Sequence, residues 1–172
     1  YLHNKDMEIN VWDRIIAFEG RMHEFIKAAY DYQDNTFHSH PGYYIDYFEM
    51  RLAQLQVLHN LHYEIKKIRK MPKQALVIAD YIMYMADYVV EMNIPDQQIE
   101  KLEEISEQMK QEELPKTREE FEGRALLYHI LMDLEEFLVY KKRFVNGLDE
   151  KKLRIYWKQE MEQKDSANEL QK

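Results

Sequence analysis

Apolar residues recur at alternating spacings of three and four along most of this chain, and that pattern restricts its fold more than any other feature. The clearest example is the stripe Val11, Ile15, Phe18, Met22 and Phe25. Residues with this spacing lie on one face of an α-helix. No segment alternates between apolar and polar residues with a period of two, which is the pattern of a half-buried strand. The sequence therefore favours helices that pack through apolar faces.

Further segments repeat this spacing and are separated by residues that favour turns. A second helix ends before Pro72, because the residue that precedes a proline is disfavoured in helical geometry. The third, about Lys73–Met92, is apolar on most of its circumference, so we expect it to be the most buried. A fourth helix opens at Pro95, and the capping box Thr117–Glu120 starts a fifth.

The end of the chain predicts one more helical segment. Gly147 is suited to end the fifth helix, and Asp149 is suited to cap a last one. We therefore predict an all-α fold, an antiparallel bundle of four to five long helices with a C-terminal helical extension. The bundle domain is assigned to residues 1–145, and the helical extension or tail to residues 146–172.

Charge and composition exclude several classes of function. The formal net charge is −8, whereas binding to nucleic acid requires clustered lysine and arginine. The chain has no cysteine, which excludes a disulfide framework, thiolate zinc sites and thiol catalysis. Its longest apolar stretch is interrupted by Asp80 and is too short to span a bilayer, so we expect the chain as given to be soluble. No cofactor is expected, since the 4 scattered glycines build no phosphate-binding loop.

Two histidines have a spacing that suits metal binding. His59 and His62 lie at positions i and i+3 of the second helix, on one face. Neither Glu-x-x-His nor His-Glu-x-x-His occurs in the sequence, so the signatures of di-iron bundles and zinc proteases are missing. We favour histidines that are hydrogen bonded at the edge of the core, with a metal site as the weaker alternative. No other catalytic motif occurs, so we do not expect an enzyme.

Arg51 falls where the apolar stripe of the second helix should continue, so we expect it to be partly buried. A buried guanidinium needs a partner, because an unpaired charge in the interior is strongly destabilising. The favoured interpretation is an ion pair with a carboxylate that faces the core. The functional alternative is a bidentate grip on the carboxylate of a ligand, for which arginine is well suited.

The third predicted helix carries an acidic stripe on an otherwise apolar cylinder. Asp80, Tyr84, Asp87 and Glu91 lie at i, i+4, i+7 and i+11. The simplest interpretation is a solvent-exposed face. If the helix is central, the carboxylates of this stripe would instead lie in a pocket or pair with Arg51 or the histidines, and raised pKa values there would indicate function.

Tyrosine is abundant, with 13 copies in 172 residues. Tyr43, Tyr44 and Tyr47 form a cluster one turn before Arg51. Aromatic side chains with a polar tip are favoured in interfaces and ligand pockets, although they are also common at the edge of a core. These four residues, with Asp80, Tyr84 and Asp87, are our candidates for a ligand site or an interface.

Two blocks of the sequence resemble the putative aromatic acid exporter family in its C-terminal domain. They are Tyr43–Arg51 and Leu114–Ala125, and Asp133–Leu138 is also similar. The resemblance covers about Met7–Phe144, most of the chain. It implies a bacterial membrane protein whose N-terminal half carries the transmembrane helices and whose C-terminal half is a cytoplasmic helical bundle.

Three hypotheses follow. In the first, the chain is the soluble domain of an exporter-like protein, at the cytoplasmic face of the membrane and joined to the transmembrane region of the same polypeptide. It would assemble subunits as a homo-oligomer, gate the pore, or bind a small aromatic or carboxylate ligand. The alternative is a stand-alone helical sensor or adaptor that binds a partner helix. The third is a metal-dependent enzyme that uses His59, His62 and nearby carboxylates.

Overall fold

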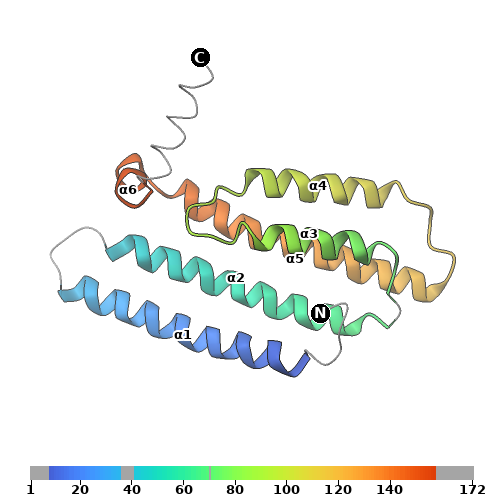
Figure 1. Cartoon of the computed structure of the whole chain (residues 1–172), viewed down its shortest axis with the longest axis horizontal. Coiled ribbons are helices and arrows are strands. Elements are labelled where there is room, and N and C mark those ends of the chain that lie inside the picture. The colour runs from blue at the N-terminus through green and yellow to red at the C-terminus, as the bar shows by residue number, and fades with distance from the viewer. Residues whose placement is uncertain (1–7, 36–40, 70, 158–172) are drawn as a thin grey trace, which may run out of the picture.

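The structure, a computed structural model, describes residues 8–35, 41–69 and 71–157 (Figure 1). These residues form helices and no strands, which confirms the predicted all-α class. In chain order the helices are α1 (Glu8–Asn35), α2 (Pro41–Lys67), α3 (Ala75–Ala86), α4 (Asp96–Lys110), α5 (Arg118–Asn146) and α6 (Glu150–Tyr156). The helices α1 to α5 run roughly along one common direction, and each reverses the course of the one before it (Figure 1).

The core lies around α5, because this helix packs against α2 on one side and against α4 and α3 on the others. Its buried residues are three or four positions apart, and Leu134 is only 1% exposed. Burying an apolar side chain of this size stabilises the fold by about 1.5–3 kcal/mol. The buried apolar residues of α5 are Leu127, Ile130, Leu131, Leu134, Phe137, Leu138 and Phe144.

The predicted helix ends are confirmed where local capping defines them. The Thr117 hydroxyl accepts a hydrogen bond from the backbone N–H of Glu120 at 3.1 Å, and it begins α5. Asp149 accepts from the backbone N–H of Lys152 at 2.7 Å and begins α6. At the end of α5, the N–H of Gly147 donates to carbonyls of the last helical turn. Each cap satisfies backbone groups that have no partner within their own helix.

The third helix is shorter and more exposed than predicted. It ends at Ala86 instead of Met92, and its outer face leaves Leu76 and Met83 56% and 72% exposed. The prediction that it is the most buried helix is wrong, because α3 packs on the other helices with one face only and its outer face stays exposed. Hydropathy measures the tendency to be buried, whereas burial itself depends on which elements cover the helix.

The helix α1 lies at the edge of the bundle, beside α2 (Figure 1). Among its described side chains only Met22 is buried, while Phe18 and Phe25 remain 40% and 46% exposed.

None of the helices in the described part of the chain combines the length and the apolar composition that crossing a membrane requires.

The C-terminal extension packs on the bundle as far as residue 157. The ring of Tyr156 stacks on that of Tyr43, at the start of α2, with 3.9 Å between the ring centroids. Trp157 is 3% exposed and lies in a cluster with Tyr43, Met50 and Phe144. The remainder of the extension, residues 158–172, lies outside the described residues.

Candidate functional site

Arg51 is held by neutral hydrogen-bond acceptors. Its Nε donates to the hydroxyl of Tyr47 at 3.0 Å, and its Nη1 donates to Oε1 of Gln54 at 2.9 Å. Gln54 in turn donates to the backbone carbonyl of Phe137 at 2.8 Å, which ties α2 to α5. The ion pair that we expected for Arg51 is not found among the described residues, where a hydroxyl and an amide are its partners. The described hydrogen-bond partners of the half-buried guanidinium are therefore both neutral.

Lys141 is a second cation of the interior, and its side chain lies on α5. It is 4% exposed, and its Nζ donates to the backbone carbonyl of Glu91. The ammonium lies 5.8, 5.3 and 5.4 Å from the ring centroids of Tyr47, Phe144 and Trp157. Aromatic faces at this distance attract a cation, which compensates part of the cost of its burial.

Sequence reasoning missed Lys141. It stands in a run of basic residues near the end of α5, where cations are usual because they complement the helix dipole. The position of Lys141 in the helical repeat of α5 could have identified it as buried. Position 141 follows Leu134 and Phe137 and precedes Phe144 at spacings of three and four, so it lies on the buried face.

A small cavity lies beside Arg51 and Lys141. About 10 Å³ is open to the centre of a water molecule, roughly the room that one water needs. The polar part of its lining consists of two cations, Arg51 and Lys141, and three amides, Gln54, Asn93 and Gln98. No carboxylate is among the described residues that line the cavity. The apolar part comes from α3, α5 and the segment between α3 and α4: Met85, Tyr88, Val89, Val90, Pro95, Phe137 and Leu138.

Tyr84 contacts one of these amides, Gln98, but is not among the residues that line the cavity. Gln98, which is 1% exposed, donates to the Tyr84 hydroxyl at 3.2 Å and accepts from Asn93 at 3.2 Å. The hydroxyl of Tyr81 donates to the backbone carbonyl of Gln98 at 2.7 Å. The ammonium of Lys101 lies 3.7 Å from the centroid of the Tyr84 ring. These contacts fix the amide of Gln98 at the cavity wall.

The acidic stripe predicted for the third helix is divided in the structure. Asp80 and Asp87 are exposed, in agreement with the simpler interpretation of a solvent face. Glu91 departs from the predicted stripe because α3 ends at Ala86. The chain after that helix turns the Glu91 carboxylate toward Tyr43, whose hydroxyl donates to it at 2.8 Å.

The three clustered tyrosines occupy two different places. Tyr43 is 1% exposed, and its hydroxyl also accepts from the indole N–H of Trp157 at 3.0 Å. Burial raises the pKa of Tyr43 well above its ordinary value, so the hydroxyl stays protonated. Tyr47 contacts Arg51, as described. Tyr44 is 45% exposed and lines a hollow on the side of α1, away from the cavity.

The paired histidines pack against Trp12 of α1. The indole ring lies 4.5 Å from the ring of His59 and 5.3 Å from that of His62, measured between centroids. Within the described residues, no group of three or more His, Cys, Asp or Glu side chains is arranged to hold a metal ion. The contacts of this pair therefore join α1 to α2 through aromatic packing.

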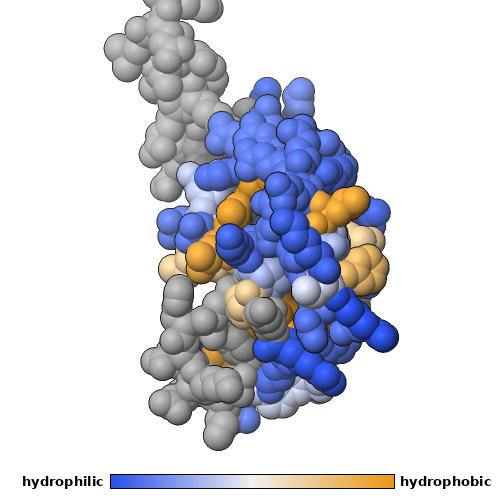
Figure 2. Space-filling view, turned by 90° about the vertical axis from the view of Figure 1, so that its right-hand side faces the viewer, coloured by the Kyte–Doolittle hydropathy of each residue, from blue (hydrophilic) through white to orange (hydrophobic). Residues whose placement is uncertain are grey.

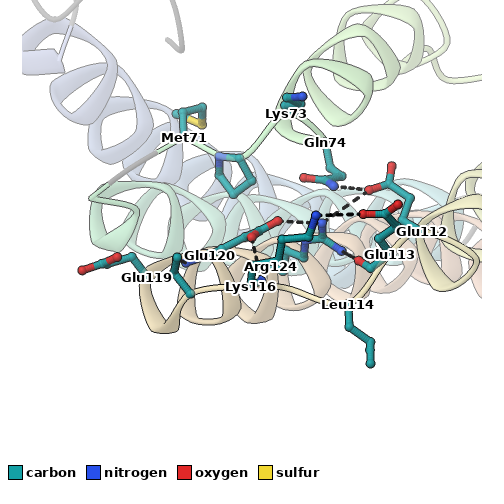
Figure 3. Close-up of a pocket in the computed structure, with 12 residues that line it drawn as sticks. Met71, Lys73, Gln74, Glu112, Glu113, Leu114, Lys116, Glu119, Glu120 and Arg124 are labelled. Atoms are coloured by element: carbon teal, nitrogen blue, oxygen red, sulfur yellow. Dashed lines mark hydrogen bonds and ion pairs between the residues drawn. The ribbon is translucent and has the colours of Figure 1, made fainter.

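A larger hollow, about 570 Å³, lies between the α2–α3 turn and the α4–α5 loop (Figure 3). Arg124 reaches across it: Nη2 lies 2.8 Å from a carboxylate oxygen of Glu120 and 3.8 Å from one of Glu112, and Nη1 donates to the backbone carbonyl of Glu113 at 2.5 Å. Gln74 donates to Glu112 from the opposite wall. The end of the molecule shown in Figure 2 is covered largely by hydrophilic residues.

This hollow involves the second of the two sequence blocks singled out above, Leu114–Ala125. The charges of its lining are largely joined to one another, since Arg124 contacts the acidic side chains around it. Such contacts hold the α4–α5 loop against the start of α5. We therefore assign the block a structural role, and we place the candidate site at the cavity beside Arg51 and Lys141.

Comparison with known proteins gives three findings. The family described as "Putative aromatic acid exporter C-terminal domain" matches residues 1–142, which include Arg51 and Lys141. YqjA of Bacillus subtilis strain 168, named only as an uncharacterized protein, is 32% identical over 98 residues, or 57% of this chain and 30% of that protein. A crystal structure described as a putative membrane protein from Clostridium difficile 630 has a TM-score of 0.69 and 26% identity, over 81% of this chain and 86% of the other. The chain thus spans about 30% of the length of the curated relative that it matches.

Proposed function

Because the chain belongs to the putative aromatic acid exporter family as its C-terminal domain, we propose that it is the cytoplasmic sensor domain of an exporter-like membrane protein. The transmembrane region of the same polypeptide would be its partner, and its role would be regulatory instead of catalytic. In this proposal the domain binds a small carboxylate between Arg51 and Lys141. The family match and the similarity to a protein described as a membrane protein support the first part.

The single observation that carries the second part is the lining of the cavity. The chain has a net charge of −8, yet this interior cavity has two cations and three amides in its described lining and no carboxylate. Hydrogen bonds to charged groups contribute about 1.5–3 kcal/mol each. Two such bonds, with a buried apolar body on the ligand, correspond to affinities of about millimolar to micromolar.

In this structure the cavity is too small for a whole aromatic acid. Binding therefore requires the segment that covers the cavity to move. Tyr88, Val89 and Val90 close it from the segment between α3 and α4, and they are 38%, 41% and 51% exposed. This segment has no regular helix, and fewer backbone bonds resist its displacement than would in a helix. In the proposal, a bound ligand displaces this segment, and the displaced segment is the signal.

Titration calorimetry of the 172-residue chain with benzoate tests this function, with benzamide as the neutral ligand of the same shape. We expect benzoate to bind and benzamide to bind at least about tenfold more weakly, since a charge-assisted bond is lost. Arg51→Gln and Lys141→Met should each weaken benzoate binding by a similar factor. Arg118→Gln is the matched control, because Arg118 is an exposed cation whose partner is Glu122.

Circular dichroism verifies that each variant remains folded. Equal affinities for benzoate and benzamide would contradict the carboxylate site. So would folded Arg51→Gln and Lys141→Met variants that bind benzoate as the original chain does. Absence of benzoate binding at millimolar concentrations to the original chain would contradict the proposal for aromatic acids, and the same titration with acetate would then test aliphatic ones.

A further inference from the structure

The surface between α1 and α2 carries an apolar groove with two hollows. The first, about 360 Å³, lies between Val11 and Arg21 of α1 and is closed on the α2 side by Leu55. The second, about 370 Å³, is lined by the rings of Phe25, Tyr32, Tyr44 and Phe48, with Ala28 and Ala29 between them. The two hollows follow one another along α1. We call them together the α1–α2 groove.

We propose that the α1–α2 groove is the interface between two copies of this chain, paired antiparallel through α1 about a two-fold axis at the level of residue 23, between Arg21 and Phe25. None of the residues that line the groove lines the cavity of Arg51 and Lys141. The inference therefore stands independently of the proposed carboxylate site.

The shape of the groove is complementary to itself. A two-fold axis brings position i of one copy to position j of the other, and j to i. With the axis at residue 23, Phe18 meets the partner's Ala28, so a large side chain lies opposite a small one. The same axis brings Arg21 to the partner's Phe25 and Arg14 to the partner's Tyr32. Both are contacts of a guanidinium with an aromatic ring, which attract each other.

The charges of the groove favour the same occupant. Its described lining contains Arg14 and Arg21 but no aspartate or glutamate. In a chain with a net charge of −8, most surfaces of two copies repel each other. A strip without carboxylates lets two acidic chains approach with little repulsion.

The face of α1 and α2 that carries the groove is large enough for a stable dimer. The helix α1 has 28 residues, which gives a length of about 42 Å. Two neighbouring helices present a width of about 20 Å, so the face covers roughly 800 Å², the area that each partner of a standard interface buries. Within one chain, the partner of α1 is α2, and Met22 is its only buried side chain among those described.

Single-cysteine cross-linking tests the geometry, because the chain has no cysteine of its own. Arg21→Cys places a thiol within two residues of the axis, and a short bismaleimide should join two chains into a species of twice 21.1 kDa. Glu100→Cys, on the exposed side of α4, is the control and should remain uncross-linked. Equal cross-linking of both variants would overturn the proposed geometry.

Sedimentation equilibrium of the 172-residue chain tests the association itself. We expect a monomer–dimer equilibrium for the original chain. Phe18→Glu should raise the dimer dissociation constant by at least about tenfold, since it places a charge in an apolar contact. Phe121→Glu on α5 makes the same change at a residue that is 61% exposed and lies outside the groove, and it should have no effect.

Circular dichroism checks that Phe18→Glu retains its helices, and Ala28→Trp provides a second variant that fills the hollow without adding charge. A dimer that resists both changes would overturn the inference. So would a chain that stays monomeric at every concentration, and the groove would then be assigned to the rest of the polypeptide.

Discussion

At the scale of single residues, Asp133 on α5 has an unfavourable environment that can be measured. Its Oδ2 is buried and has no hydrogen-bond partner among the described residues. Burial, followed by the charge of Glu64, raises the pKa of Asp133, while His129 opposes the shift. The folded state thus binds this proton more tightly than the unfolded state does. Asp133 therefore lowers stability above its folded pKa and has no such effect below the unfolded pKa, where both states are protonated.

We predict that Asp133→Asn stabilises the protein at neutral pH by about 1 kcal/mol, because the neutral amide removes a charge that is partly buried without a hydrogen bond at Oδ2. The side chain is only half-buried, and solvent screening keeps the gain small. The gain should disappear below about pH 4, where the original carboxyl group is protonated in both states. Thermal melts of the two proteins across pH measure it, with the exposed Glu135→Gln as control. A gain that is independent of pH would contradict the explanation.

Single residues also show where sequence reasoning reaches its limit. The burial of Arg51 was predictable because helical spacing determines which face a residue occupies. The partners of Arg51 were not predictable, since the hydroxyl of Tyr47 and the amide of Gln54 compete with carboxylates as acceptors. Only the packing of α2 on α5 decides among these acceptors. Lys141 and its aromatic neighbours depend on α6 as well, because Trp157 supplies one of the rings.

At the scale of elements, the ends of helices could be predicted from the sequence, whereas the burial of helices could not. The caps at Thr117 and Asp149 were predictable because a cap involves residues only three positions apart. The extent of α3 was not, because its continuous hydropathy contains no local stop signal before Pro95. Its exposure depends on distant helices that leave its outer face uncovered.

The residue that follows the short helix α6, Trp157, joins Tyr156 in holding this end of the chain on the bundle. We predict that Trp157→Ala lowers the free energy of unfolding by about 3 kcal/mol, as expected for a buried large aromatic side chain. Trp157→Phe retains most of the ring but loses the N–H that donates to Tyr43, so about 1 kcal/mol should be lost. Urea unfolding measures both. Equal losses for the two variants would show that the hydrogen bond, and not the packing, holds α6.

At the scale of the whole molecule, the two proposed sites lie on different parts of α2. The groove uses Tyr44, Phe48 and Leu55 on the side of α1, whereas Arg51 and Gln54 face the cavity. Because α2 is packed along its length against both α1 and α5, its displacement would disturb both interfaces. The segment 87–95 contributes residues to the cavity, and none of its residues lines the groove. A signal from the bound carboxylate should therefore travel through this segment and leave the groove unchanged.

Hydrogen exchange followed by mass spectrometry tests this separation. We predict that saturating benzoate increases amide exchange in the segment 87–95, because the ligand displaces that cover, and leaves exchange in α1 unchanged. Arg51→Gln serves as the control, since benzoate should produce no change in a variant that cannot bind it. If benzoate instead altered exchange along α1, the two sites would be coupled. By reciprocity, dimer formation would then change the affinity for benzoate by the factor by which benzoate changes the affinity between the two copies.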